Sequence, residues 1–224
     1  MKRMATSRGE RRDGFARRVL GLAPVALAAA LLGGCSTSTP TRFYTLSSPA
    51  ESAPPVAQQV AAPVYVEFAP LALPERLVRP QLVIRGRSDD GKPSRIEVLE
   101  GDQWASSFEY ELRDALANGV ARRLGAVNTT VGGRPPGQAA WRISVEVVQF
   151  EPIEDQRVEV ALGWSVRRSD GGTESSCRWS TSEPVDKGID ALTQGAQRAV
   201  ARAADAMARH VAALQAGRAA DCGG

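Results

Sequence analysis

The chain has 224 residues, with 28 Lys and Arg against 25 Asp and Glu and a single His, which gives a formal net charge of +3. Seven of the basic and two of the acidic residues fall within residues 1–34, so the remaining 190 residues carry 21 basic and 23 acidic side chains. That slightly acidic balance argues against nucleic-acid binding, because phosphate contacts need a positive face. The remaining length suits one domain with a full hydrophobic core.

Residues 1–34 are typical of a bacterial export signal. A basic stretch, residues 1–18, precedes an apolar stretch from Val19 to Leu32, which is the order of charge and hydropathy that the secretion machinery recognises. The apolar stretch contains Pro24 and is shorter than the ~20 residues that a bilayer-spanning helix needs, so it is not a permanent membrane anchor.

The end of this signal predicts a lipid attachment site. Leu32-Gly33-Gly34-Cys35 resembles the lipobox of bacterial lipoproteins, in which the signal is cut before the cysteine and the cysteine is acylated. Several acyl chains hold a protein firmly at a membrane, since each buried methylene contributes ~0.8 kcal/mol. Ser36 is the kind of residue that permits transfer to the outer membrane, so we expect lipid anchoring at its periplasmic face. An ordinary secretory signal with a chance cysteine is the alternative.

Composition divides the rest of the chain into three parts. Residues 35–62 comprise the lipidated cysteine, a short strand at Arg42 to Leu46 that returns to the main sheet, and a linker rich in Pro, Ala and Ser. Such a linker buries too little apolar area to offset the entropy of ordering. Residues 63–216 form the folded domain, and residues 217–224 form a flexible tail.

The first half of the domain predicts three strands and a helix. The strands are Val64 to Phe68, a more central one at Gln81 to Arg85, and one at Arg95 to Leu99 that ends before Gly101. Ser106 and Glu109 have the spacing of a capping box, so we expect the helix to begin there and to end at Gly125.

The second half predicts a three-stranded meander and a long helix. A Gly/Pro-rich loop at 129–137 is followed by strands at 141–147, 158–166 and 173–181, and apolar residues then recur at helical spacing over 189–214. The fold class is therefore α/β, a single domain with a mixed, largely antiparallel sheet packed by two main helices. Strict alternation in the meander leaves one sheet face much more polar than the other, for water or a polar protein surface.

No residue pattern predicts catalysis, a metal or a cofactor. His210 is the only candidate general base, and it lies on the last helix, where a structural or solvated role is the usual one. The four tryptophans share the apolar phase of neighbouring strands or a helix entry, so we expect core packing. The acidic residues of the meander are expected to be solvated; they are Glu146, Glu154, Asp155 and Glu159.

Two cysteines, Cys177 and Cys222, remain beyond the lipobox. An oxidising compartment favours a bridge between them, which would attach the tail to the third meander strand. In the chain-entropy model, closing this span stabilises the fold by about 4 kcal/mol.

Several segments resemble the ABC-type transport auxiliary lipoprotein family, which includes the PqiC-type lipoproteins. They are Arg42-Phe43-Tyr44-Thr45-Leu46, the stretch from Leu73-Pro74 to Arg79-Pro80-Gln81 and on to Arg85, and Trp104 before the first helix. Val78 and the segment 103–108 depart from the usual family residues.

The resemblance implies a role that composition does not. It implies a non-catalytic subunit of an envelope system that carries lipids between membranes, with an MCE-domain protein and its membrane transport components as partners and a homo-oligomeric ring as a possible assembly. Leu73, Pro74, Arg79, Pro80 and Gln81 are the expected contact residues, within residues 71–85, where Pro74 and Pro80 are expected to hold an extended approach to a strand. A rigid strand entry is the alternative for Arg79-Pro80-Gln81. A second hypothesis is a lipoprotein that activates a peptidoglycan synthase, and a third is an envelope hydrolase dependent on His210.

Overall fold

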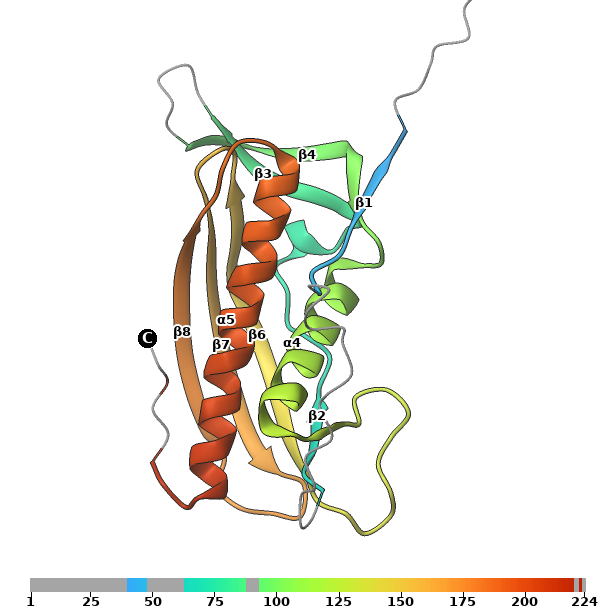
Figure 1. Cartoon of the computed structure of the whole chain (residues 1–224), viewed down its shortest axis with the longest axis vertical. Coiled ribbons are helices and arrows are strands. Elements are labelled where there is room, and N and C mark those ends of the chain that lie inside the picture. The colour runs from blue at the N-terminus through green and yellow to red at the C-terminus, as the bar shows by residue number, and fades with distance from the viewer. Residues whose placement is uncertain (1–39, 48–62, 88–92, 220–221, 223–224) are drawn as a thin grey trace, which may run out of the picture. The chain divides into compact units, whose positions relative to one another are not determined.

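The computed structural model describes residues 40–47, 63–87, 93–219 and 222. The export signal at 1–34, Cys35 and most of the linker therefore lie outside the described residues. Within the unit from Thr41 to the C-terminus, eight strands form one sheet and two long helices pack on it (Figure 1). The strands are β1 (Arg42–Tyr44), β2 (Tyr65–Phe68), β3 (Gln81–Arg87), β4 (Pro93–Trp104), β5 (Val127–Asn128), β6 (Ala140–Ile153), β7 (Arg157–Arg168) and β8 (Ser175–Pro184), and the helices are α4 (Phe108–Leu124), α5 (Ile189–Gln215) and the short 3-10 helix η1 (Glu75–Leu77).

Strand β6 is the centre of the sheet. Its one edge pairs with β7, which pairs in turn with β8, and both of these long pairings are antiparallel. Its other edge receives β2 at its beginning and β3 at its end, both parallel, with a single bridge between Ala72 and Glu146 in the middle. Strand β4 pairs antiparallel with β3, and the short β1 and β5 add to β4 and β2 in parallel. The expected mixed, largely antiparallel sheet with two helices is confirmed.

Both helices cover the same face of the sheet, and the core lies beneath them (Figure 1). The residues of β6 and β7 that alternate toward the helices are buried apolar side chains, as in Ile143, Val145, Leu162 and Trp164. Helix α5 meets this layer with small residues and Met207. All four tryptophans are buried, at 3 to 8% exposure, so the expectation of core packing is confirmed.

The opposite face of the sheet carries small and polar side chains. Directly paired residues on it include Ser144 with Ser165 and Glu146 with Gly163, and Arg178 of β8 continues the second row. No described helix covers these residues, which are exposed or half-buried. The predicted contrast between the two faces is therefore present in the structure.

The start of α4 differs from the sequence-based prediction. Ser107, one residue after the predicted cap, is the N-cap, and its hydroxyl accepts a hydrogen bond from the Tyr110 amide. Glu109, the second predicted member of the capping box, instead accepts from the backbone amide of Leu71, and its distance is 3.3 Å. The predicted capping box was therefore wrong, because the Glu109 carboxylate bonds to a distant part of the chain rather than to the start of its own helix. The predicted end at Gly125, with a left-handed backbone, is confirmed.

Two strand boundaries also differ. Strand β4 does not end before Gly101 but runs to Trp104, because β1 pairs with residues 102–104 and extends the sheet. The β6–β7 turn is tighter than predicted: β6 continues through Ile153, and only residues 154–156 connect the strands. Among the described helices, none combines the length and the apolar character needed to cross a bilayer.

Candidate docking surface

Strand β1 fixes the N-terminal segment to the domain through its polar side chains. Arg42 forms an ion pair of 2.8 Å with Asp102. The Tyr44 hydroxyl lies between two carboxylates, at 2.8 Å from Asp190 and 3.2 Å from Asp102, and its single proton is shared between these two acceptors. Burial, and then the hydrogen bond to Asp190, raises the pKa of Tyr44, so the phenol keeps its proton and remains a donor.

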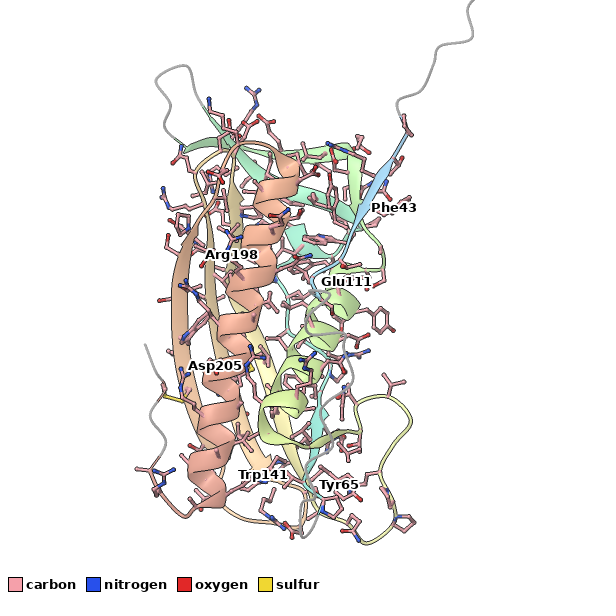
Figure 2. The ribbon with its side chains drawn as sticks, viewed as in Figure 1. Phe43, Tyr65, Glu111, Trp141, Arg198 and Asp205 are labelled. Carbon is pink, nitrogen blue, oxygen red and sulfur yellow. A yellow bond between two sulfur atoms is a disulfide. The ribbon has the colours of Figure 1, made fainter. Side chains whose placement is uncertain are left out.

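The residues after β1 attach to both helices. Leu46 is fully buried, and its amide donates to the Glu111 carboxylate of α4 at 3.0 Å. Gln197 of α5 donates from its side chain to the Thr45 carbonyl at 2.9 Å. Figure 2 shows Glu111 beside the path of this segment. The chain that arrives from the N-terminus is therefore held by β4, α4 and α5 at once.

The predicted contact segment leaves the edge of β6 between β2 and β3. Ala72 still bonds to β6, since its amide donates to the Val145 carbonyl at 3.0 Å, and the chain then turns outward at the half-buried Leu73 and Pro74. The prediction of an extended approach was wrong for residues 75–77, which form η1. The Leu77 amide donates to the Pro74 carbonyl at 2.9 Å, so Pro74 starts a helical turn.

Leu77 anchors this segment from beneath. It is 4% exposed and lies with Trp104, Phe108 and Phe150 around a very small internal cavity. The ring centroids of Phe108 and Phe150 are 4.8 Å apart, edge to face. The outer side is free, because Val78 is 67% exposed and Arg79 and Pro80 are also exposed. A buried leucine thus holds an exposed apolar and cationic turn in a fixed position.

Strand β1 and this turn meet on either side of residues 103–105. The Trp104 amide donates to the Pro80 carbonyl at 2.8 Å, and the Ala105 amide donates to the Tyr44 carbonyl at 2.7 Å. Phe43 and Gln81 each pair with Gln103, so they occupy one row across the sheet. Phe43 is 64% exposed, although it is the largest apolar side chain of its strand.

We refer to Phe43, Val78, Arg79, Pro80 and Gln81 as the docking surface. The structure thus brings three of the predicted contact residues together with Phe43 and Val78, while Leu73 and Pro74 form the base of the turn. Phe43 was missed as a contact residue because a strand pattern alone does not tell which face of a terminal strand is covered. The other predicted contact region, the exposed face of the meander, carries the small and polar side chains that no described helix covers.

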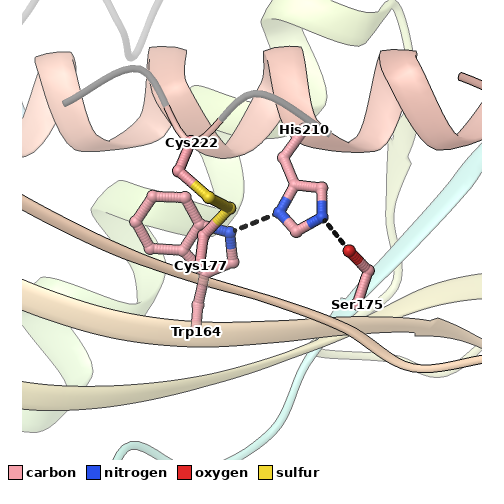
Figure 3. Close-up of a disulfide and its surroundings, with 5 residues drawn as sticks. All are labelled: Trp164, Ser175, Cys177, His210 and Cys222. Atoms are coloured by element: carbon pink, nitrogen blue, oxygen red, sulfur yellow. Dashed lines mark hydrogen bonds between the residues drawn. A yellow bond between two sulfur atoms is a disulfide. The ribbon is translucent and has the colours of Figure 1, made fainter. Parts of the chain in front are cut away.

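The two remaining cysteines lie at the other flank, between β8 and the chain after α5 (Figure 3). Cys177 and Cys222 form a disulfide with a Cα–Cα distance of 5.4 Å. Cys177 is 5% exposed and packs within the core, so the bridge ties the chain after α5 to a buried point of the meander.

His210 lies close to this bridge and is fully buried (Figure 3). The Trp164 indole, which can only donate, lies 2.8 Å from Nδ1, so this nitrogen carries no proton. In the neutral imidazole the proton is therefore on Nε2, which donates to the Ser175 hydroxyl at 2.9 Å. Burial lowers the pKa of His210 and favours this neutral form. A base that already holds its proton toward the serine cannot accept the proton of that serine.

Two of the four acidic residues of the meander have structural partners. Glu159 bonds to Arg157 and to the Gln149 amide, and Asp155 accepts from the Gly188 amide before α5. Glu146 is exposed on the open sheet face, and Glu154 is half-buried in the β6–β7 turn. In the part of the chain that the structure describes, no group of three or more His, Cys, Asp or Glu side chains is arranged to hold a metal.

Comparison with known proteins assigns the chain to a family. The family model described as ABC-type transport auxiliary lipoprotein component matches residues 44–208, which include every strand of the sheet except part of β1. The chain belongs to this family. Membership identifies it as an auxiliary lipoprotein component of an ABC-type transport system and as a membrane-anchored protein of the cell envelope. No curated protein matches the chain significantly.

Solved structures of this fold are also similar. A crystal structure of an uncharacterized protein matches with a TM-score of 0.57 and 18% identity, over 77% of this chain and 99% of that one. A Xanthomonas campestris protein of the DUF330 family matches with a TM-score of 0.51 and 15% identity, over 80% of this chain and 95% of that one. The PelC dodecamer from Paraburkholderia phytofirmans reaches a TM-score of 0.35 at 13% identity, over 67% of this chain and 90% of that one, which is too weak to bear on fold or assembly.

Proposed function

We propose that the protein is a non-catalytic auxiliary subunit of an MCE/ABC-type system that carries lipids between the two membranes. In this proposal, acylated Cys35 holds it at the periplasmic face of the outer membrane, and the docking surface binds an MCE-domain protein. The observation that carries the proposal is the turn at 78–80, which is exposed although Leu77 and the Pro80 carbonyl hold it firmly to the core. A fixed, partly apolar surface suits partner binding.

Electrostatics and position add support. Among the described residues no carboxylate lies within ion-pair distance of Arg79, so its guanidinium is available to an acidic group of a partner. The docking surface also includes Phe43 of β1, and β1 is the first described element after the proposed anchor. A partner bound there would approach the protein near its tether to the membrane.

The test is capture of the MCE-domain partner from native membranes by the acylated protein. Val78→Asp combined with Arg79→Glu should reduce capture at least tenfold. The first substitution puts a carboxylate into the apolar part of the contact, and the second puts a negative charge opposite the acidic group that Arg79 is proposed to bind. Val131→Asp combined with Arg218→Glu is the matched control, since Val131 is 73% exposed, Arg218 is also exposed, and both residues lie outside the docking surface and the strands of the meander. Equal capture by both variants, or capture of a peptidoglycan synthase instead, would contradict the proposal.

The anchor has its own prediction. Cys35→Ser removes the acceptor sulfur, so we expect loss of acylation and release of the protein from the outer-membrane fraction. Mass spectrometry of the mature wild-type protein should find residue 35 as the acylated first residue. Ser36→Ala serves as a control that preserves the cysteine. A mature chain that begins elsewhere, or that carries no acyl groups, would refute this part of the proposal.

A homo-oligomeric ring is the proposed assembly of the subunit. Among the described strands, the short β1 and the longer β8 each pair on one side only, so their outer edges are places where copies of the chain could associate. Native mass spectrometry of the acylated protein in detergent should find a single closed oligomer. A monomer at all protein concentrations would count against the ring without affecting the anchor or the docking surface.

A further inference from the structure

The end of the sheet opposite β1 carries a cluster of arginines that the proposed function does not use. A hollow of about 390 Å³ there is lined by Glu67, Arg134, Arg142, Arg167, Arg168 and Ser169, with two glycines of the β7–β8 turn. A neighbouring hollow of about 360 Å³ shares Arg142 and Arg167 and also includes Glu174. Figure 2 shows Trp141, the neighbour of Arg142 in β6, toward the lower end of the view and Phe43 in its upper part.

The charges of this cluster do not balance. Glu67 lies between two arginines, with Arg134 at 3.2 Å and Arg142 at 3.3 Å, so one carboxylate serves two guanidinium groups. Arg168 pairs with Asp170 through two hydrogen bonds and lies over the Trp141 ring. Among the described residues, no carboxylate is within ion-pair distance of Arg167. Four arginines therefore face two paired carboxylates, and Glu174 at the rim does not remove the excess.

The arginines without full compensation lie side by side. Arg142 and Arg167 are direct cross-strand partners on the open sheet face, and Glu67 is the partner of Arg142 on the other side. Like charges at directly opposite sheet positions are destabilising, so this pair costs stability unless an anion lies between them. Ser169 adds a hydroxyl whose oxygen accepts from the Ala140 amide at 3.0 Å, which leaves its proton free to donate.

We propose that this cluster, centred on Arg142 and Arg167, is a binding site for a phosphate group. Planar guanidinium groups bind phosphate oxygens in pairs, and several of them around one hollow suit the tetrahedrally arranged oxygens of a phosphate group better than a single carboxylate. Because the lining is mostly polar, it offers little apolar surface for an acyl chain. The phosphate belongs either to a free small anion or to the headgroup of a phospholipid. Phosphate binding at this end of the sheet does not depend on the proposed MCE partner, which is expected at the docking surface.

The test measures binding of three phosphate probes to the full acylated protein in nonionic detergent by isothermal titration calorimetry. The probes are inorganic phosphate, sn-glycerol 3-phosphate and dihexanoyl phosphatidylglycerol, each at constant ionic strength. Arg142→Gln combined with Arg167→Gln should weaken binding at least tenfold. Arg178→Gln combined with Arg218→Gln removes the same charge from exposed positions outside the hollows and should change binding less than twofold.

The outcomes separate the two sources of phosphate. Similar affinity for all three probes, lost in the first variant, supports a site for a free phosphate group. Binding of phosphatidylglycerol alone, lost in the same variant, supports a headgroup site. The proposal is overturned if none of the probes binds or if both variants lose binding equally.

Discussion

His210 shows how a single buried side chain can combine a structural and a titrating role. Its two ring nitrogens connect α5 to two strands of the meander, through Trp164 and Ser175. Because the indole fixes the tautomer, the pair of His210 and Ser175 lacks the free lone pair that a general base needs. The residue that sequence reasoning regarded as the only candidate base therefore has a geometry that favours packing.

The buried histidine predicts a pH dependence of stability. Its pKa in the unfolded chain is near 6.5, and burial lowers it in the folded protein. The unfolded state thus binds more protons below pH 6.5, so stability is full above that pH and falls as the pH decreases toward the lowered folded pKa, by at most about 1.4 kcal/mol per pH unit.

The measurement compares urea unfolding at pH 7.5 and pH 5.5 in the wild type and in His210→Gln. Glutamine keeps an acceptor and a donor but does not titrate, so its loss of stability between these pH values should be smaller than that of the wild type. An identical loss in both proteins would show that other groups cause the effect.

At the level of elements, local sequence predicted most positions correctly and failed where distant segments intervene. The helix end at Gly125 and the alternating strands of the meander depend on neighbouring residues, and the helix end and the strand starts were placed to within two positions, although β6 extends six residues beyond its predicted end. The helix start was displaced because Glu109 bonds to Leu71 rather than to its own helix. Strand β4 was predicted too short because its last residues pair with β1, which lies 58 positions away in the chain at the Tyr44–Asp102 contact.

The corrected helix start can be tested with two serines. Ser107→Ala removes the hydroxyl that accepts from the Tyr110 amide and should lower the free energy of unfolding by about 1 kcal/mol. Ser106→Ala removes exposed hydrogen bonds from the hydroxyl to Glu111 and, at 3.5 Å, to the Ser107 carbonyl, and should cost less than about 0.5 kcal/mol. Chemical denaturation of both variants measures the two losses of stability and decides whether Ser107 or Ser106 is the N-cap. A larger loss for Ser106→Ala would favour Ser106, as the sequence predicted.

For the whole molecule, the periodicity of apolar residues predicted the class of fold but not the order in which the strands pair. The alternation of β6 and β7 predicts a hairpin, yet nothing local to β6 indicates that β2 and β3 share its other edge. The arginine cluster and the docking surface follow from that topology, since Arg142 and Arg167 become neighbours only once the register is fixed. Of the docking surface, the Arg79-Pro80-Gln81 segment was accessible from the family resemblance, whereas Phe43 required the pairing of β1.

The disulfide joins the third meander strand to the chain after α5. It closes a span of 45 residues, for which the chain-entropy model gives about 4 kcal/mol of stabilisation. Cys177→Ala combined with Cys222→Ala should lower the free energy of unfolding by up to this amount. Wild type treated with dithiothreitol is the control that preserves side-chain volume. Mass spectrometry of the non-reduced mature protein that finds two free thiols would contradict the bridge.

The parallel pairing of β1 with β4 determines how tension from an anchor at Cys35 would travel. A pull on the N-terminus reaches β4 and the start of α5 directly through Arg42 and Tyr44, so residues 48–62 lie outside the mechanical path between bilayer and domain. Insertions within 48–62 should leave the height of the domain above the bilayer unchanged, whereas the same insertions within 36–40 should increase it. With an anchor at Cys35, the spacing of the domain from the membrane would thus depend on the few residues that precede β1.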